Sequence, residues 1–194
     1  MRDGVLYAWR DPVLRYLLFI VAGIDVTLNG AFAVGLPVLV QEHLSGGAAA
    51  LGILDSGFAA GAILRIVIAG SMRTPPRKGI VTVVITAGFG VGVALLGVMP
   101  NLVAATVCIA AMAIGSGLAN VILVPWMQMR TDPSMLGRVM SMFMLASLGL
   151  TPLSYVAAGW LAGISYTLVF FIGGAIVLST AAFALLNPTI RTIR

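Results

Sequence analysis

The sequence predicts an all-α membrane protein with six transmembrane helices, and three observations support that fold class. Apolar residues make up 60% of the 194 residues and charged residues only 9%, whereas soluble chains are usually about 45–50% apolar and about 25% charged. Apolar stretches long enough to cross a bilayer recur between short polar connections. The basic residues gather in alternate connections, as they do in polytopic membrane proteins. A soluble domain is therefore excluded.

Six apolar segments are predicted to form the helices, and each is bounded by charged residues, proline or glycine. A helix rises about 1.5 Å per residue, so each segment can cross a hydrocarbon core of about 30 Å with some tilt. The segments cover residues 14–40, 50–71, 80–98, 102–128, 137–162 and 166–187. Because the connections between them are short, consecutive helices should be antiparallel neighbours.

The two ends of the chain lie outside this bundle of residues 14–187. Residues 1–13 carry Tyr7 and Trp9 beside Arg10, which fits an amphipathic helix on the inner leaflet as well as an irregular start with an aromatic anchor. They contain no short apolar region followed by a cleavage site, so no signal peptide is expected. Residues 188–194 are predicted to form a cytoplasmic tail.

Basic residues predict the orientation of the bundle. Ten of the eleven Lys and Arg residues lie before or at the start of the first helix, after the last helix, or in or beside the second-to-third and fourth-to-fifth connections. The other three connections contain no Lys or Arg, only Glu42 and His43. The positive-inside rule then predicts a multi-pass protein of the inner (plasma) membrane with both termini in the cytoplasm. The net charge of +5 belongs to the membrane boundary, so the lipid bilayer and not nucleic acid is the expected partner.

The stretch from Arg130 to Gly163 shows the membrane pattern most clearly. Arg130, Asp132 and Arg138 mark a short charged connection, and the residues from there to Gly163 carry no charge. Many of them are Gly, Ala, Ser or Thr, which allow helices to pack closely within a membrane.

A faint internal repeat relates the first and fourth predicted helices. Gly35 to Gln41 reads G-L-P-V-L-V-Q, and Leu123 to Gln128 reads L-V-P-W-M-Q. The predicted topology puts these two helix ends on opposite sides of the membrane. A three-plus-three inverted repeat would produce that relation.

Asp25 and Asn29 are the first candidates for a substrate or proton pathway. Asp25 lies about 18 Å into the first predicted helix, near the middle of the membrane. A charged carboxylate there costs at least about 2.5–3.5 kcal/mol unless it is paired, hydrated or protonated. Asn29 follows at i+4 and so shares its face. The alternative is a carboxylate in a wet cavity with no role in transport.

Arg65, Asn120 and Gln128 complete that candidate set. Arg65 lies about 10 Å from the cytoplasmic end of the second helix, where it can snorkel to the interface or pair with Asp25 on the neighbouring helix. Asn120 and Gln128 on the fourth helix are candidates to line a cavity. Trp126 between them is better explained as an interfacial anchor.

Enzyme chemistry is not expected from this sequence. Gly115-Ser116-Gly117 lacks the preceding glycine of an intramembrane serine protease motif, and the only histidine, His43, lies in an outer connection. With one histidine and the single Cys108, no metal-ligand cluster can form, and no cofactor is expected.

The segment L-G-R-V-M-S-M-F-M-L-A-S-L-G-L-T-P-L-S-Y-V-A-A-G-W-L-A, residues 136–162, resembles the eleventh helix and preceding loop of major facilitator superfamily transporters. Similarity to the bacterial drug, siderophore and macrolide exporters extends to residues 2–15, which resemble the loop before their seventh helix, and to residues 32–40, which resemble its end. The resemblance spans the chain but only the C-terminal half of the family's twelve helices.

The resemblance implies a major-facilitator-type half bundle and a gating role for the cytoplasmic loops. The candidate gating residues are Arg73, Arg77, Lys78 and Arg138. The second-to-third connection, Gly70 to Gly79, keeps the basic residues of the family's gating motif but lacks its acid.

The implied function is secondary active efflux of small amphipathic or hydrophobic compounds, coupled to protons. Such transport works by alternating access between two bundles, so this half-transporter would need a second six-helix bundle. The partner would be another copy of the chain or a separate N-terminal half. The alternative is a non-transporting assembly subunit, or a truncated C-terminal half of a twelve-helix transporter.

Overall fold

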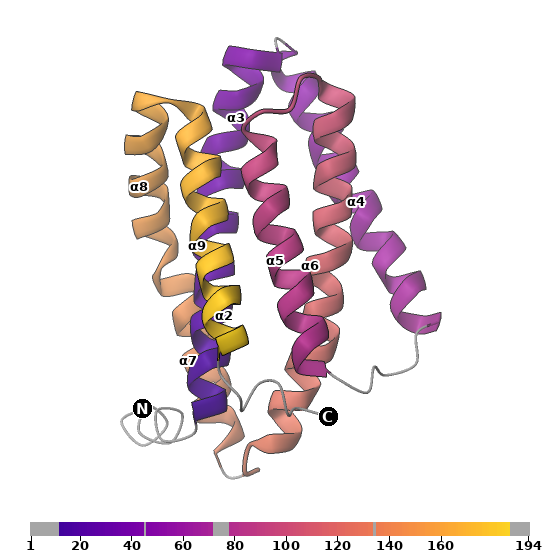
Figure 1. The fold of residues 1–194 in the computed structure, drawn as a ribbon, viewed down its shortest axis with the longest axis vertical. Coiled ribbons are helices and arrows are strands. Elements are labelled where there is room, and N and C mark those ends of the chain that lie inside the picture. Colours follow the sequence, from indigo (N-terminus) through magenta and orange to yellow (C-terminus); the bar gives the residue numbers. More distant parts are fainter. Residues whose placement is uncertain (1–11, 45, 72–77, 134, 187–194) are drawn as a thin grey trace.

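The computed structural model describes residues 12–44, 46–71, 78–133 and 135–186, and within them it contains only helices and short connections. The helices run side by side along the long axis of the molecule (Figure 1). The all-α class predicted from the sequence is confirmed.

The first rod of the bundle is one continuous helical run that changes its winding along its length. It consists of α2 (Pro12–Gly30), the π-helix η1 (Ala31–Gly35), α3 (Leu36–Leu39) and the π-helix η2 (Val40–Leu44). Pro37 has no N–H to donate to the carbonyl four residues earlier, and its ring presses against that carbonyl. The wider winding of η1 in the turn before Pro37 relieves this conflict.

Four further helices are long and uninterrupted. They are α4 (Gly47–Ser71), α5 (Lys78–Leu96), α6 (Leu102–Arg130) and α9 (Tyr166–Leu186). The turn into α4 is made possible by Gly47, whose φ of 55° suits a residue without a Cβ.

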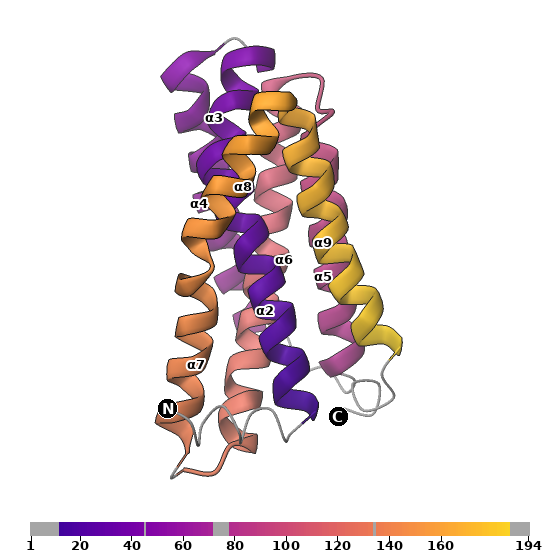
Figure 2. The same cartoon turned by 90° about the vertical axis from the view of Figure 1, so that its left-hand side faces the viewer.

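The predicted fifth helix over 137–162 is divided in the structure into α7 (Leu136–Gly149) and α8 (Thr151–Ile164). The two meet at Leu150, and α8 continues the course of α7 (Figure 2). Pro152 explains the break, because proline cannot bond to the preceding turn but is well suited to the first turn of a helix. Ser154 resumes the ladder, with its N–H nitrogen 3.0 Å from the carbonyl oxygen of Leu150.

Four described stretches are long and apolar enough to cross a membrane: Val21–Leu44, Gly47–Gly70, Gly79–Leu96 and Tyr166–Leu185. Two shorter apolar helical stretches cover Leu102–Leu118 and Leu136–Leu145. Several long apolar helices of this kind are the structure of a membrane-embedded protein.

The helices form an arc in which each packs on the next. In spatial order α4 packs on α6, α6 on α5, α5 on α9, and α9 on α2, which also contacts α7 and α8. The core lies among η1, α3 and η2, the start of α4, the second half of α5, the first half of α6, and the start of α9. Its fully buried members include Leu39, Val93, Leu96, Ile109 and Phe170.

The described ends of the long rods alternate between two ends of the bundle. The start of α2, the end of α4, both ends of the α6–α7 connection and the end of α9 lie toward the bottom of Figure 1. Lys78 and Arg130 are terminal residues of α5 and α6, and Arg138 lies in the first turn of α7. We call this the basic end; Glu42 and His43 of η2 lie at the opposite end.

Candidate functional site

A hollow of about 460 Å³ lies between the first rod and α4, part-way along the bundle. We call it the α2–α4 hollow. It is lined by Asp25, Leu28, Asn29, Phe32, Ala33 and Phe58. Asp25 and Asn29, the two polar members, share a face as the sequence predicted, and their role in a substrate or proton pathway stays a prediction.

The two polar residues are locked to one another by local bonding. The Asn29 side-chain amide donates to the backbone carbonyl oxygen of Asp25, with Nδ2 and O 2.8 Å apart. This bond fixes the Asn29 amide one helical turn after Asp25 along α2. Both residues are partly exposed, and both line the hollow. A hydrogen-bonding amide and a carboxylate are thereby presented together in an otherwise apolar helix.

Aromatic rings close the hollow on the side away from the basic end. Phe32 and Phe58 meet edge to face, with ring centroids 5.7 Å apart and planes inclined at 69°. Phe32 lies in η1, and π-helical turns occur often at functional sites because they redirect side chains. Neither ring was predicted from the sequence, where the available signal was spacing: Phe32 follows Asp25 by seven residues, and Phe58 precedes Arg65 by seven.

Arg65 lies on α4 beside the hollow, not in its lining. Its side chain crosses to α6 and covers the backbone of Gly117, so closely that a Cβ at Gly117 would collide with its Cδ and guanidinium nitrogens. The ion pair with Asp25 that the sequence suggested stays a prediction, because the side chain is directed toward α6.

The remaining candidates lie elsewhere. Gln128 belongs to the last turn of α6 and does not line the hollow. Asn120 belongs to α6, but its side chain is outside the described structure.

The predicted gating residues are only partly described. Arg73 and Arg77 lie outside the described residues, and Lys78 is the first residue of α5. Arg138 is exposed, and its Nη1 donates to the sulfur of Met135 at 3.7 Å. The assignment of these residues to a gate stays a prediction.

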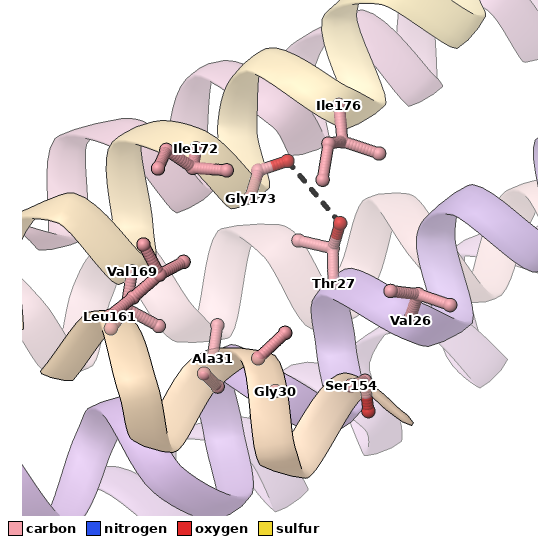
Figure 3. A pocket seen from close by; sticks show the side chains of 12 residues that line it. Val26, Thr27, Gly30, Ala31, Ser154, Leu161, Val169, Ile172, Gly173 and Ile176 are labelled. Atoms are coloured by element: carbon pink, nitrogen blue, oxygen red, sulfur yellow. Dashed lines mark hydrogen bonds between the residues drawn. The ribbon is translucent and has the colours of Figure 1, made fainter. Parts of the chain in front are cut away.

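A second, smaller cavity of about 60 Å³ lies between α2, α8 and α9 (Figure 3). The Thr27 hydroxyl donates across it to the carbonyl oxygen of Gly173 at 3.3 Å, and the Ser154 hydroxyl donates within its own helix to the carbonyl oxygen of Thr151 at 2.7 Å. The rest of the lining is apolar, so this cavity is a packing defect beside a helix–helix hydrogen bond.

Within the described residues, no group of three or more His, Cys, Asp or Glu side chains could hold a metal ion. The lining of the α2–α4 hollow offers one acid and one amide that could orient a small organic molecule and two rings that could contact it. Comparison of the chain with protein family models, with curated proteins and with solved structures finds no match.

Proposed function

We propose that this chain is half of a secondary active transporter, a six-span bundle that works with a second bundle by alternating access. Its substrates are small amphipathic or hydrophobic compounds, exported in exchange for protons across the inner membrane, with both termini in the cytoplasm. The observation that carries the proposal is the α2–α4 hollow, which presents Asp25 and Asn29 from the first half of the apolar stretch Val21–Leu44.

The placement of Asp25 beside the hollow supports a functional role. A carboxylate within an apolar span costs several kcal/mol of insertion free energy unless it is hydrated, paired or protonated. Here it borders a hollow of about 460 Å³, within the range of about 300–1,000 Å³ usual for small-molecule sites. A carboxylate that meets both substrate and water can carry protons between the two sides.

The helix neighbours support the inverted repeat. An inverted repeat would pair the first rod with α6, α4 with the α7–α8 rod, and α5 with α9. Under this pairing, the α4–α6 contact corresponds to the contact of α7 and α8 with α2. The α5–α6 contact becomes the α9–α2 contact, and the α5–α9 contact maps onto itself. The contact of α8 with α9 has no counterpart of similar extent. Repeats of this kind surround the substrate sites of many transporters.

A second bundle is required because the hollow has no wall on one side. The long helix α4 packs on α6 and on η2, and much of its remaining surface faces outward. Two such bundles facing each other would enclose a common pathway, whereas one alone would expose Asp25 to lipid. The partner is a second copy of this chain or a separate six-helix half.

The first test is the protein mass in lipid nanodiscs, after subtraction of the lipid and scaffold. Twice the chain mass of 20.1 kDa supports the paired bundle. Transport by a chain that remains a monomer would contradict it.

The second test measures uptake of lipophilic fluorescent dyes into proteoliposomes under an imposed pH gradient. Asp25→Asn should reduce uptake more than tenfold, because the exchangeable proton is lost. Asp55→Asn is the matched control, since Asp55 is exposed on α4 and does not line the hollow. Equal activity of the two variants would contradict the role of Asp25.

A further inference from the structure

The Phe32–Phe58 contact fixes the register between the first rod and α4. The two helices run antiparallel, because the chain turns back between η2 and α4 (Figure 1). Asp25 precedes Phe32 by seven residues, and Arg65 follows Phe58 by seven residues. Seven residues are two helical turns, about 10 Å of rise and nearly the same face. Asp25 and Arg65 therefore lie at one level, on facing helices, on the basic-end side of the two rings.

The Arg65 side chain occupies a slot that depends on a glycine. Gly117 of α6 is buried beneath it, and the backbone there leaves room for the Cδ and guanidinium only because no Cβ is present. At Gly115, on the same helix, an added Cβ would make only an ordinary contact, 3.5 Å from Cγ2 of Ile85. The slot is thus a local feature of Gly117.

The slot at Gly117 holds the Arg65 side chain against α6. Along the α4–α6 seam, Gly57 lies against Thr106 and Gly61 against Ala110 and Ala113. Continuing that parallel register brings Arg65 to within about one turn of Gly117. Its side chain therefore extends sideways to α6 instead of running down α4 to the membrane surface, as snorkelling would require.

We propose that amphipathic organic anions bind across the α2–α4 hollow and the adjoining Arg65 side chain, which lies outside the lining of the hollow on its α6 side. The Phe32–Phe58 pair contacts the apolar body within the hollow, and Arg65 receives the carboxylate or sulfonate at its edge. A guanidinium keeps its charge at any physiological pH and matches a planar carboxylate with two parallel N–H donors. About 10 Å separates its level from the rings, which suits an arylalkyl acid. The inference rests on the proposed transport function for its role in the cell, but the binding itself is measurable without transport.

Asp25, in the lining of the hollow on the facing helix, changes the electrostatic potential at this site. A charged carboxylate there repels a bound anion and competes with it for the guanidinium. Removing the charge by Asp25→Asn should therefore strengthen anion binding severalfold, even though the same change should stop proton-coupled transport.

The test uses a pair of probes that differ in the sign of their charge, 4-phenylbutyrate and 4-phenylbutylamine. Saturable binding of each radiolabelled probe is measured on the full chain in nanodiscs, with empty nanodiscs as the background. Saturable binding of the acid and none of the amine is expected. Arg65→Gln should weaken binding of the acid at least tenfold, and Arg65→Lys should weaken it less.

The glycine slot supplies a test that leaves the arginine in place. Gly117→Ala should displace the Arg65 side chain and weaken binding of the acid about as much as Arg65→Gln, whereas Gly115→Ala should not. The double variant Gly117→Ala with Arg65→Gln should bind no worse than Arg65→Gln alone. Size-exclusion profiles identify any variant that fails to fold, and Gly115→Ala reports whether α6 tolerates an added methyl group.

Three results would overturn the inference: tighter binding of the amine, no saturable binding of the acid, or unchanged binding after Arg65→Gln. Failure of the transport proposal is distinguishable from these. If the acid binds through Arg65 but no pH-driven uptake occurs, the anion site stands and the transporter does not. If dyes are transported and the acid does not bind, the reverse holds.

Discussion

The two sides of the arc differ in how tightly their helices pack. On the α5–α9 side, half of the apolar span of α5 is buried within the chain, and Gly90 and Gly174 bring the two backbones into contact. On the other side only 17% of the apolar span of α4 is buried, and α4 leans outward toward its end (Figure 1).

We therefore expect the α5–α9 side to stabilise the fold and the α4 side to bind ligand. The α5–α9 pair contains large buried side chains and close backbone contact, which make a rigid seam. α4 contributes Phe58 to the hollow, and few side chains in the half of α4 that contains Arg65 are buried by the rest of the chain. Elements with few buried contacts move at low cost, as a gating helix must. We expect substitutions on the first side to change stability and those on the second to change binding.

The largest loss of stability should follow truncation of Phe170. Its side chain is fully buried, whereas that of the next residue, Phe171, is 47% exposed. Phe170→Ala should cost about 3–5 kcal/mol of unfolding free energy, because it leaves a cavity in the core. Phe171→Ala should cost much less. Thermal unfolding in detergent measures both, and equal losses would mean that the core has been misassigned.

A smaller loss should follow a single methyl group in the α5–α9 seam. A Cβ at Gly174 would lie 2.7 Å from the carbonyl oxygen of Gly90, a backbone atom that cannot yield without moving the helix. Gly174→Ala should therefore cost about 1–3 kcal/mol. Gly88→Ala on α5 meets open space and serves as the control. If both variants unfold at the same temperature, α5 and α9 are not as close as described.

On the α4 side, the aromatic contact offers a substitution that separates binding from folding. Phe58→Leu keeps most of the buried volume but removes the edge-to-face contact, worth about 0.5–1.5 kcal/mol. The unfolding temperature should change little, while binding of 4-phenylbutyrate should weaken severalfold. A variant with lowered stability and unchanged binding would show that the ring only packs.

The sequence predicted the all-α class of fold and the shared face of Asp25 and Asn29, because both follow from patterns along the chain. Long apolar segments set the helices, and the i to i+4 spacing set Asp25 and Asn29 on one face. It did not predict the break at Leu150, although Pro152 was a visible signal, because prolines near helix interiors often only bend a helix.

The binding surface could not be predicted because it depends on register between helices. Nothing local indicates that Phe32 meets Phe58 or that Gly117 lies beneath Arg65. Every helix is apolar nearly all round, so the sequence does not distinguish a cavity-facing side chain from a lipid-facing one. Packing in three dimensions decides which of many similar glycines forms a slot.

The smallest effect should come from the outer face of α4, away from the Arg65 side chain. Ile66 is 66% exposed and follows Arg65 by one residue, so it points away from α6 and from the hollow. Ile66→Ala should change unfolding free energy by no more than about 0.5 kcal/mol and leave binding of 4-phenylbutyrate unchanged. The same variant also tests which face meets the second bundle. If Ile66→Ala lowers the dimer fraction in nanodiscs, the outer face of α4 lies in the interface. An unchanged dimer fraction would fit the arrangement proposed above, in which the two bundles meet across the hollow and this face contacts lipid.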